Sequence, residues 1–252
     1  MRPYKVGYKN KIIVVMVCLA FYSCVNDKSQ QIVDKCIEKH GGAAYETLKV
    51  GFDFRDRHYT AVRNKGSFTY TREFSDSTGN IRDVLDNAGF VRYRGGKAAE
   101  ITDERRNAFT NSVNAVIYFA LLPSGLNDDA VNKEWIEQTT IKGEPYDLIR
   151  ITFDPHGGGK DHQDEFLYWI HQENSTLDYM AYSYEVDGGG LRFREAMNPR
   201  QVGGILFQDY INYQPEDERI PIRQVQSLFT TGKLKKLSEI KLDNLQVINL
   251  NE

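Results

Sequence analysis

The sequence predicts a mainly β protein of the α+β class, a curled antiparallel sheet or incomplete barrel of about 11–12 strands covered by helices. Along most of the chain apolar and polar side chains alternate with a period of two, and turn-forming clusters such as Asn174-Ser175-Thr176 separate these runs. Only two segments show helical spacing. Because strands and helices do not alternate, the pattern argues against Rossmann folds and TIM barrels, which are built from parallel βαβ units.

The N-terminus has the layout of a secretory signal peptide. Its basic residues, with no acid among them, are Arg2, Lys5, Lys9 and Lys11. The apolar run that follows, residues 12–21, has about half of the roughly 20 residues that a membrane-spanning helix needs. The run is followed by Tyr22-Ser23-Cys24, and a small residue before a cysteine at this place resembles the lipobox of bacterial lipoproteins. The resemblance implies that Cys24 is the lipidated first residue of the mature chain; a cleaved signal peptide with a soluble periplasmic product is the alternative.

These boundaries predict a signal peptide over 1–23, a lipidated tether over 24–28 and a single β domain over 29–252, which we expect to be a monomer. Removing the signal peptide takes away four of the 32 basic residues and none of the 35 acidic ones, which leaves a net charge near −7. That balance excludes a nucleic-acid partner, which would require an excess of basic residues. Cys36 is then the one cysteine outside the signal and the anchor, so a disulfide scaffold is excluded as well.

Two segments have the spacing of amphipathic helices. In the first, Ile32, Val33, Cys36 and His40 share a face, and Gly41-Gly42 supplies a C-terminal stop. The second runs from Thr102 to about Leu122. Thr102 is suited to cap its start, and its apolar residues are Phe109, Val113, Val116 and Ile117.

The remaining periodic segments are predicted to be strands joined as antiparallel neighbours. Asp86-Asn87-Ala88-Gly89 is a good hairpin signal, because Asn and Gly accept positive φ angles. The predicted strands lie at about 50–54, 68–74, 81–85, 90–94, 131–141, 146–153, 165–171, 178–186, 191–197, 204–213, 220–230 and 239–249. Several of them are apolar on both faces, which favours a sheet curled around the helices.

This plan resembles a family of uncharacterised Gram-negative envelope lipoproteins that look like the LolA/LolB lipoprotein-carrier superfamily. The resemblance rests on the helix ending in HGG, on residues 166–184 (FLYWIHQENSTLDYMAYSY) and 188–213, and on the GGG and DHQDEF motifs at 157–166. In LolA and LolB an incomplete barrel closed by helices receives acyl chains. The resemblance therefore implies a half barrel with an apolar cavity, without establishing lipoprotein transport.

The expected lining of that cavity is a set of aromatic strand positions together with one helix face. The candidates are Phe52, Phe54, Phe68, Tyr70, Trp169 and Tyr182 on strands, and Phe109, Val113 and Ile117 on the second helix. The competing interpretation is that the same side chains simply fill the core.

The most concentrated polar segment is the loop over residues 154–165. His156, Asp161, His162 and Asp164 could bind a divalent metal, because imidazole and carboxylate groups suit zinc or a harder cation. The loop lacks a known ligand spacing, so the alternative is a solvated hairpin loop. No other cofactor is indicated.

Arginine and histidine give weaker signals. Arg192 and Arg194 lie two residues apart on one strand face and could bind a carboxylate or phosphate head group. The favoured interpretation is that they lie on a solvated outer face and pair with acidic residues of neighbouring strands. His40 and His171 stand at element ends, where local hydrogen bonding is the commoner role for histidine.

The function that these features favour is non-catalytic. We expect a lipoprotein anchored in the envelope of a Gram-negative bacterium, facing the periplasm or the cell surface, that holds a lipid or another apolar ligand. One alternative is a metal-assisted hydrolase using the loop histidines and aspartates. Another is a structural or partner-docking lipoprotein.

Overall fold

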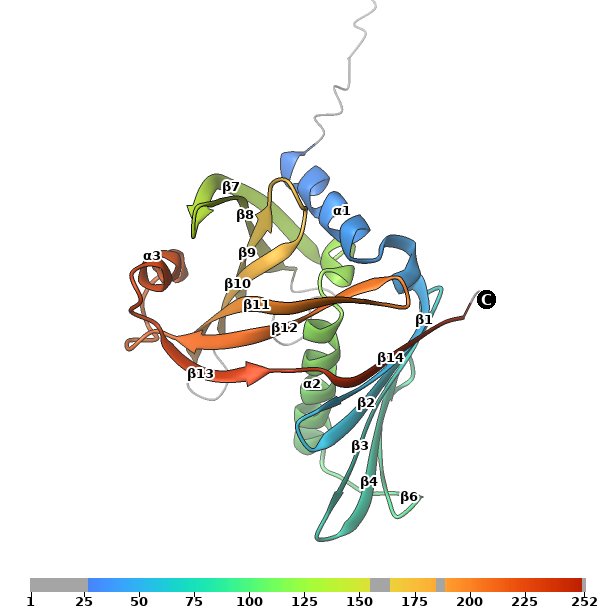
Figure 1. Ribbon diagram of the computed structural model, residues 1–252. Helices are drawn as coiled ribbons and strands as arrows, with labels where there is room; N and C mark the ends of the chain where they lie inside the picture. The colour runs from blue at the N-terminus through green and yellow to red at the C-terminus, as the bar shows by residue number, and fades with distance from the viewer. Residues whose placement is uncertain (1–26, 155–163, 185–188, 251–252) are drawn as a thin grey trace, which may run out of the picture.

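A computed structural model describes residues 27–154, 164–184 and 189–250 (Figure 1). These residues form two seven-stranded sheets, and every strand pair within the sheets is antiparallel. The predicted fold class is confirmed: the chain is mainly β, its sheets curl without closing into a barrel, and helices cover them. The predicted signal peptide and most of the tether, with Cys24, lie outside the described residues.

The first sheet has the strand order β14-β1-β2-β3-β4-β5-β6. Its strands are β1 (Thr47–Phe54), β2 (Arg57–Asn64), β3 (Ser67–Asp76), β4 (Gly79–Asp86), β5 (Gly89–Arg94), β6 (Lys97–Ala98) and β14 (Asp243–Asn249). The last strand pairs with the first, with Leu48 opposite Asn249. The C-terminal strand therefore completes the sheet that the N-terminal strands begin.

The second sheet has the order β13-β12-β11-β10-β9-β8-β7. Its strands are β7 (Val131–Ile141), β8 (Glu144–Phe153), β9 (Glu165–His171), β10 (Leu177–Tyr184), β11 (Gly190–Val202), β12 (Ile205–Gln214) and β13 (Lys235–Ile240). The chain crosses from β13 at the edge of this sheet into β14 at the edge of the other, which joins the two sheets along one side.

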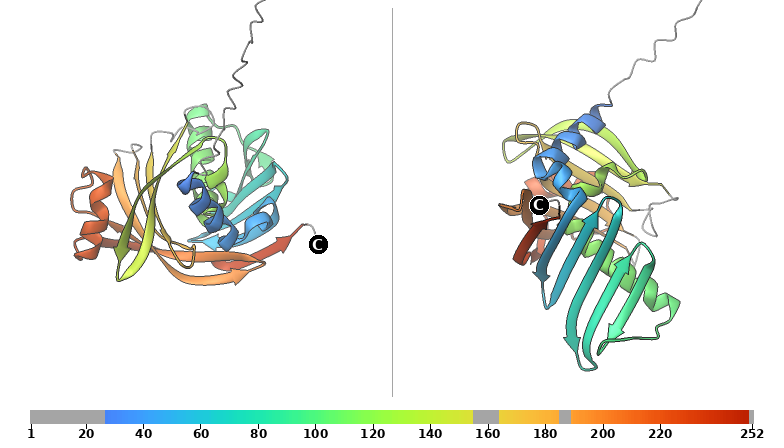
Figure 2. Two further views of the ribbon diagram at one scale, coloured as in Figure 1. Left: turned by 90° about the horizontal axis from the view of Figure 1, so that it is seen from above. Right: turned by 90° about the vertical axis from the view of Figure 1, so that its right-hand side faces the viewer.

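The described residues include three α-helices, which pack on these sheets: α1 (Lys28–His40), α2 (Asp103–Ala120) and α3 (Val225–Thr230). Short 3₁₀ segments accompany them at η1 (Gly42–Glu46), η2 (Ser124–Asn127) and η4 (Ile222–Gln224). Viewed from above, the second sheet curls around α1 and α2, and α2 runs between the two sheets (Figure 2). The predicted cap of α2 is confirmed, because the Thr102 side chain accepts a hydrogen bond from the backbone N–H of Arg105.

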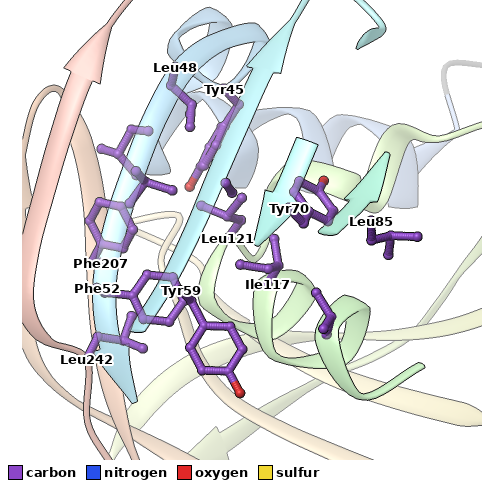
Figure 3. Close-up of a cluster of buried hydrophobic side chains, with 14 of the residues drawn as sticks. Tyr45, Leu48, Phe52, Tyr59, Tyr70, Leu85, Ile117, Leu121, Phe207 and Leu242 are labelled. Atoms are coloured by element: carbon purple, nitrogen blue, oxygen red, sulfur yellow. The ribbon is translucent and has the colours of Figure 1, made fainter. Parts of the chain in front are cut away.

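Helix α2 is packed on both sides. Toward the first sheet, Val113 and Ile117 are fully buried in one hydrophobic cluster, and Figure 3 shows Ile117 among aromatic side chains of β1, β2 and β3. Toward the second sheet, Tyr118 and Phe119 pack against Phe166 of β9. An antiparallel sheet with an apolar face needs another element packed on that face. Helix α2 meets this need for both sheets.

The structure corrects the predicted strand at 220–230. This segment is η4 followed by α3, and it covers the outer face of the second sheet through Ile222, Val225 and Phe229. Those three residues are spaced three and four apart, which is helical spacing. Three further differences concern strands: β2 and β6 both lie where no strand was predicted, and the predicted strand 239–249 is divided between β13 and β14.

His40 is buried at the end of α1 and ties that helix to the second sheet. Its Nδ1 lies 3.2 Å from the carbonyl oxygen of Leu206, and its Nε2 accepts the backbone N–H of Leu177 at 3.2 Å. A neutral imidazole satisfies both contacts, with Nδ1–H as donor and Nε2 as acceptor. Burial lowers the pKa of His40 from its ordinary value of 6.5 to about 4.

A buried row of charges holds the first sheet to α2. Asp83 on β4 lies opposite Arg72 on β3 and Arg92 on β5, and it accepts hydrogen bonds of 2.6–2.9 Å from both guanidinium groups. Arg72 also donates to the Ser112 hydroxyl on α2 at 2.7 Å, and Arg92 lies 3.5 Å from the ring centroid of Phe109. Because the Asp83 side chain is fully buried, its charge depends on these two partners.

Replacing Asp83 tests that dependence. Asp83→Asn leaves two buried arginines without a carboxylate, so we expect the free energy of unfolding to fall by about 3–5 kcal/mol. Arg82→Gln is the matched control, because Arg82 on the same strand pairs with Glu73 where both side chains are about half exposed, and we expect it to cost less than about 1 kcal/mol. Denaturant unfolding measures both, and equal effects of the two substitutions would contradict this account.

Acidification tests the role of His40. The unfolded chain takes up a proton at His40 near pH 6.5 but the folded chain only near pH 4, so this contribution to stability is complete above pH 6.5 and declines as the pH falls toward 4. Relative to His40→Gln, the wild-type protein should lose about 3 kcal/mol of unfolding free energy between pH 7 and pH 4. His58→Gln, at an exposed position, should leave that loss in place. A wild-type profile parallel to that of His40→Gln would refute the assignment.

Candidate functional site

A cavity of about 310 Å³ lies between α2 and the inner face of the second sheet. Helix α2 forms one wall, strands β10 to β13 form the other, and the turn after β1 contributes at one end. The lining residues are Phe54, Arg55, Ala115, Val116, Phe119, Ala120, Tyr182, Arg194, Gln208, Tyr210, Asn212, Ser238, Ile240 and Leu242. This volume is at the lower end of the range for small-molecule sites.

The helix wall is apolar and made mostly of small side chains. Ala115, Val116 and Ala120 leave the space that larger residues on α2 fill elsewhere, and Phe119 is the one bulky member of this wall. Tyr118, in the same stretch of α2, packs away from the cavity, with its hydroxyl 3.2 Å from that of Tyr168. The cavity therefore exists where the residues of α2 are small.

The sheet wall carries polar side chains in one row across neighbouring strands. Arg194 on β11 lies opposite Asn212 on β12, which lies opposite Ser238 on β13. Tyr210 and Gln208 follow on β12 at intervals of two, so the same strand face presents them to the cavity. Burial raises the pKa of Tyr210, so its hydroxyl stays protonated.

Arg194 is the buried cation of the cavity, at 7% relative exposure. Its Nη2 donates to the Tyr182 hydroxyl at 2.8 Å, and its guanidinium carbon lies 4.0 Å from the ring centroid of Phe119. No carboxylate of the described residues forms an ion pair with it. Two positions earlier, Arg192 pairs with Glu218 at 2.5 Å.

Unsatisfied hydrogen-bonding atoms gather at this site. Within the described ranges, the buried side-chain nitrogen and oxygen atoms without a protein partner are Nε of Arg194, Oε1 of Gln208 and Oδ1 of Asn212. All three residues line the cavity. A buried polar atom left unpaired costs about 1–3 kcal/mol, so this clustering marks the sheet wall as a place where a bound group would gain hydrogen bonds.

The predicted aromatic lining divides between the cavity and the core. Phe54 and Tyr182 line the cavity. The predicted positions that pack in the hydrophobic cluster of the first sheet are Phe52, Phe68, Tyr70, Phe109, Val113 and Ile117. Trp169 lies in the cluster on the opposite face of the second sheet, where its indole N–H donates to Gln226 at 2.8 Å.

The favoured prediction for Arg192 and Arg194, a solvated outer face, is wrong for Arg194. Leu191 and Phe193 pack with Ile222 and Phe229 on the outer face, and this directs Arg194 inward. Gln208 and Asn212 were not among the predicted site residues. Their signal was present in β12, where polar residues alternate within a strand that is buried on both faces over its first half.

The predicted metal ligands His156, Asp161 and His162 lie outside the described residues, and Asp164 immediately precedes β9. In the described part of the chain, no three His, Cys, Asp or Glu side chains are grouped so that they could hold a metal ion. His171 has a local role, because its Nδ1 accepts the backbone N–H groups of Glu173 and Asn174 at 3.2 Å. Cys36 is fully buried in the hydrophobic cluster beneath α1, and burial raises the pKa of its thiol.

Comparison with known proteins gives a family and several structural likenesses. The model of a family of unknown function, DUF6503, matches residues 10–242. No curated protein sequence matches the chain. Across the described ranges, no helix is long and apolar enough to cross a membrane.

Three solved structures illustrate the likenesses. A LolA superfamily protein from Nitrosomonas europaea is 10% identical, with 88% of this chain and 91% of that chain covered and a TM-score of 0.47. A DUF1329 family protein from Desulfovibrio piger is 10% identical, with 87% and 93% covered and a TM-score of 0.45. An outer membrane lipoprotein-sorting protein domain from Vibrio parahaemolyticus, described as putative in its name, is 7% identical, with 86% and 91% covered and a TM-score of 0.42.

Proposed function

The chain belongs to the DUF6503 family, and we propose that it is a lipid-anchored envelope protein that holds one small apolar molecule between α2 and the second sheet. The observation that carries the proposal is the cavity itself, whose helix wall is formed by Ala115, Val116, Phe119 and Ala120. An apolar ligand would bury its surface there and gain about 25 cal/mol for each Å² removed from water.

The size of the cavity limits the ligand. A methylene group is close in volume to a water molecule, which occupies roughly 30 Å³ in the liquid, so 310 Å³ holds a chain of roughly ten carbons. This favours one acyl chain or a compact ring system.

An anchor at Cys24 would hold the domain close to the membrane. Only three residues, 25–27, separate Cys24 from Lys28, the first residue of α1. The last of them, Asp27, already caps the helix, because its carboxylate accepts a hydrogen bond from the Ser29 backbone N–H at 2.9 Å. A tether this short would hold the folded domain against the membrane surface. Lipid components of that membrane are then the nearest source of apolar ligands.

A tryptophan at the rim of the cavity tests the proposed binding place. Ala115→Trp adds a large ring to the helix wall, and we expect it to weaken binding of the neutral probe decanol at least tenfold. Ala108→Trp is the matched control, because Ala108 is also exposed on α2, two turns before the cavity. Equilibrium dialysis of radiolabelled decanol with the full-length protein in nanodiscs, corrected for empty nanodiscs, gives both affinities. Equal affinities in the two variants would place binding elsewhere, and no binding to the wild type would remove the proposal.

The anchor has its own test. Cells supplied with an alkyne-labelled fatty acid should label the wild-type protein, and Cys24→Ala should abolish the label, because the thiol is the acylation site. Cys36→Ala, which alters a buried thiol, should keep it. Full labelling of Cys24→Ala would exclude Cys24 as the anchor.

A further inference from the structure

We infer that the molecule held in this cavity is a single-chain amphiphile with a carboxylate head, and that Arg194 binds the carboxylate. The inference deepens the proposed function, since it rests on the same cavity and names the chemical class of the ligand.

A buried cation needs a partner. Burying a charge costs several kcal/mol unless an opposite charge or strong hydrogen bonds compensate. Arg194 donates one hydrogen bond to the Tyr182 hydroxyl and stacks on the ring of Phe119. The cation–π contact contributes only about 0.5–2 kcal/mol. The other buried arginines show what is missing, because Arg72 and Arg92 share the carboxylate of Asp83.

The unpaired atoms suit a carboxylate. Nε of Arg194 is a buried donor without a partner, and a guanidinium presents its donors as a planar fork that matches the two oxygens of a carboxylate. Asn212 lies directly opposite Arg194 in the strand register, and Gln208 lines the same wall. If either amide turns by 180°, it offers an N–H to the ligand oxygen in place of the unpaired carbonyl oxygen.

The charge count favours a carboxylate over a doubly charged phosphate. Arg194 is the buried cation of the lining; the other lining arginine, Arg55, is exposed on the turn after β1. One buried positive charge is neutralised by one negative charge. A second negative charge would be left uncompensated in the cavity.

The two walls then receive the two ends of the ligand. The head lies against the polar row of β11 and β12, and the chain lies against Ala115, Val116 and Ala120 of α2. Phe119 contacts both regions, because its ring packs on Arg194 and also lines the apolar wall. This arrangement predicts discrimination by head group at constant chain length.

Decanoate and decanol, which differ only in the head group, test the inference. In the wild-type protein in nanodiscs at pH 7, decanoate should bind roughly 10- to 100-fold more tightly than decanol, the range for a hydrogen bond to a charged group. Arg194→Gln should lose this preference while decanol binding persists, which also shows that the variant is folded. Arg192→Gln, the matched control two residues away with its partner outside the cavity, should keep the preference.

The outcomes separate the two levels of the account. The inference is overturned if the wild type binds decanol as tightly as decanoate, or if Arg194→Gln still prefers decanoate. Either result leaves the proposal of an apolar ligand in the cavity intact. Failure of the wild type to bind either compound overturns the inference and the proposed function together.

Discussion

The structure depends on α2, which must cover the apolar faces of two curled sheets at once. Where its side chains are large, as at Ile117 toward the first sheet and Tyr118 toward the second, they fill the concave faces with the close packing of a protein core. Where they are small, as at Ala115, Val116 and Ala120, packing leaves a space against the second sheet. The cavity is therefore a direct result of residue size along one helix, and the sheets that flank it fix its walls.

The same helix meets a buried arginine on each side, and the two arginines differ in one respect. Arg92 of the first sheet lies under Phe109, and Arg194 of the second lies under Phe119, ten residues further along α2. Asp83 completes the first arrangement with a carboxylate. In the second, the neighbouring strand presents Asn212, whose carbonyl oxygen is unpaired. The first row is complete within the described residues and serves stability; we propose that a ligand completes the second.

Periodicity, turn residues and capping residues predicted the fold class, α1, α2 with its Thr102 cap, and most strands, because these depend on local patterns that tertiary contacts reinforce. The prediction failed at 220–230, where Ile222, Val225 and Phe229 fit a helix that was taken for a strand. That error hid the cover on the outer face of the second sheet, which packs on Leu191 and Phe193. The favoured prediction for Arg194 was a solvated outer face, and the cover makes that face apolar. Arg72 and Asp83 were also missed, although each occupies an apolar-face position in its strand, as Arg72 does between Tyr70 and Phe74. A charge in such a position is a signal of a buried pair.

The central claim is that the space beside α2 receives the chain of an acidic amphiphile and that Arg194 receives its head. A crystal structure of the protein with decanoate brominated at its last carbon tests this directly, since anomalous scattering locates the bromine. The account predicts bromine beside Ala115, Val116 and Ala120, with both carboxylate oxygens within hydrogen-bonding distance of Arg194. Bromine elsewhere in the molecule, or a carboxylate directed away from Arg194, would contradict it.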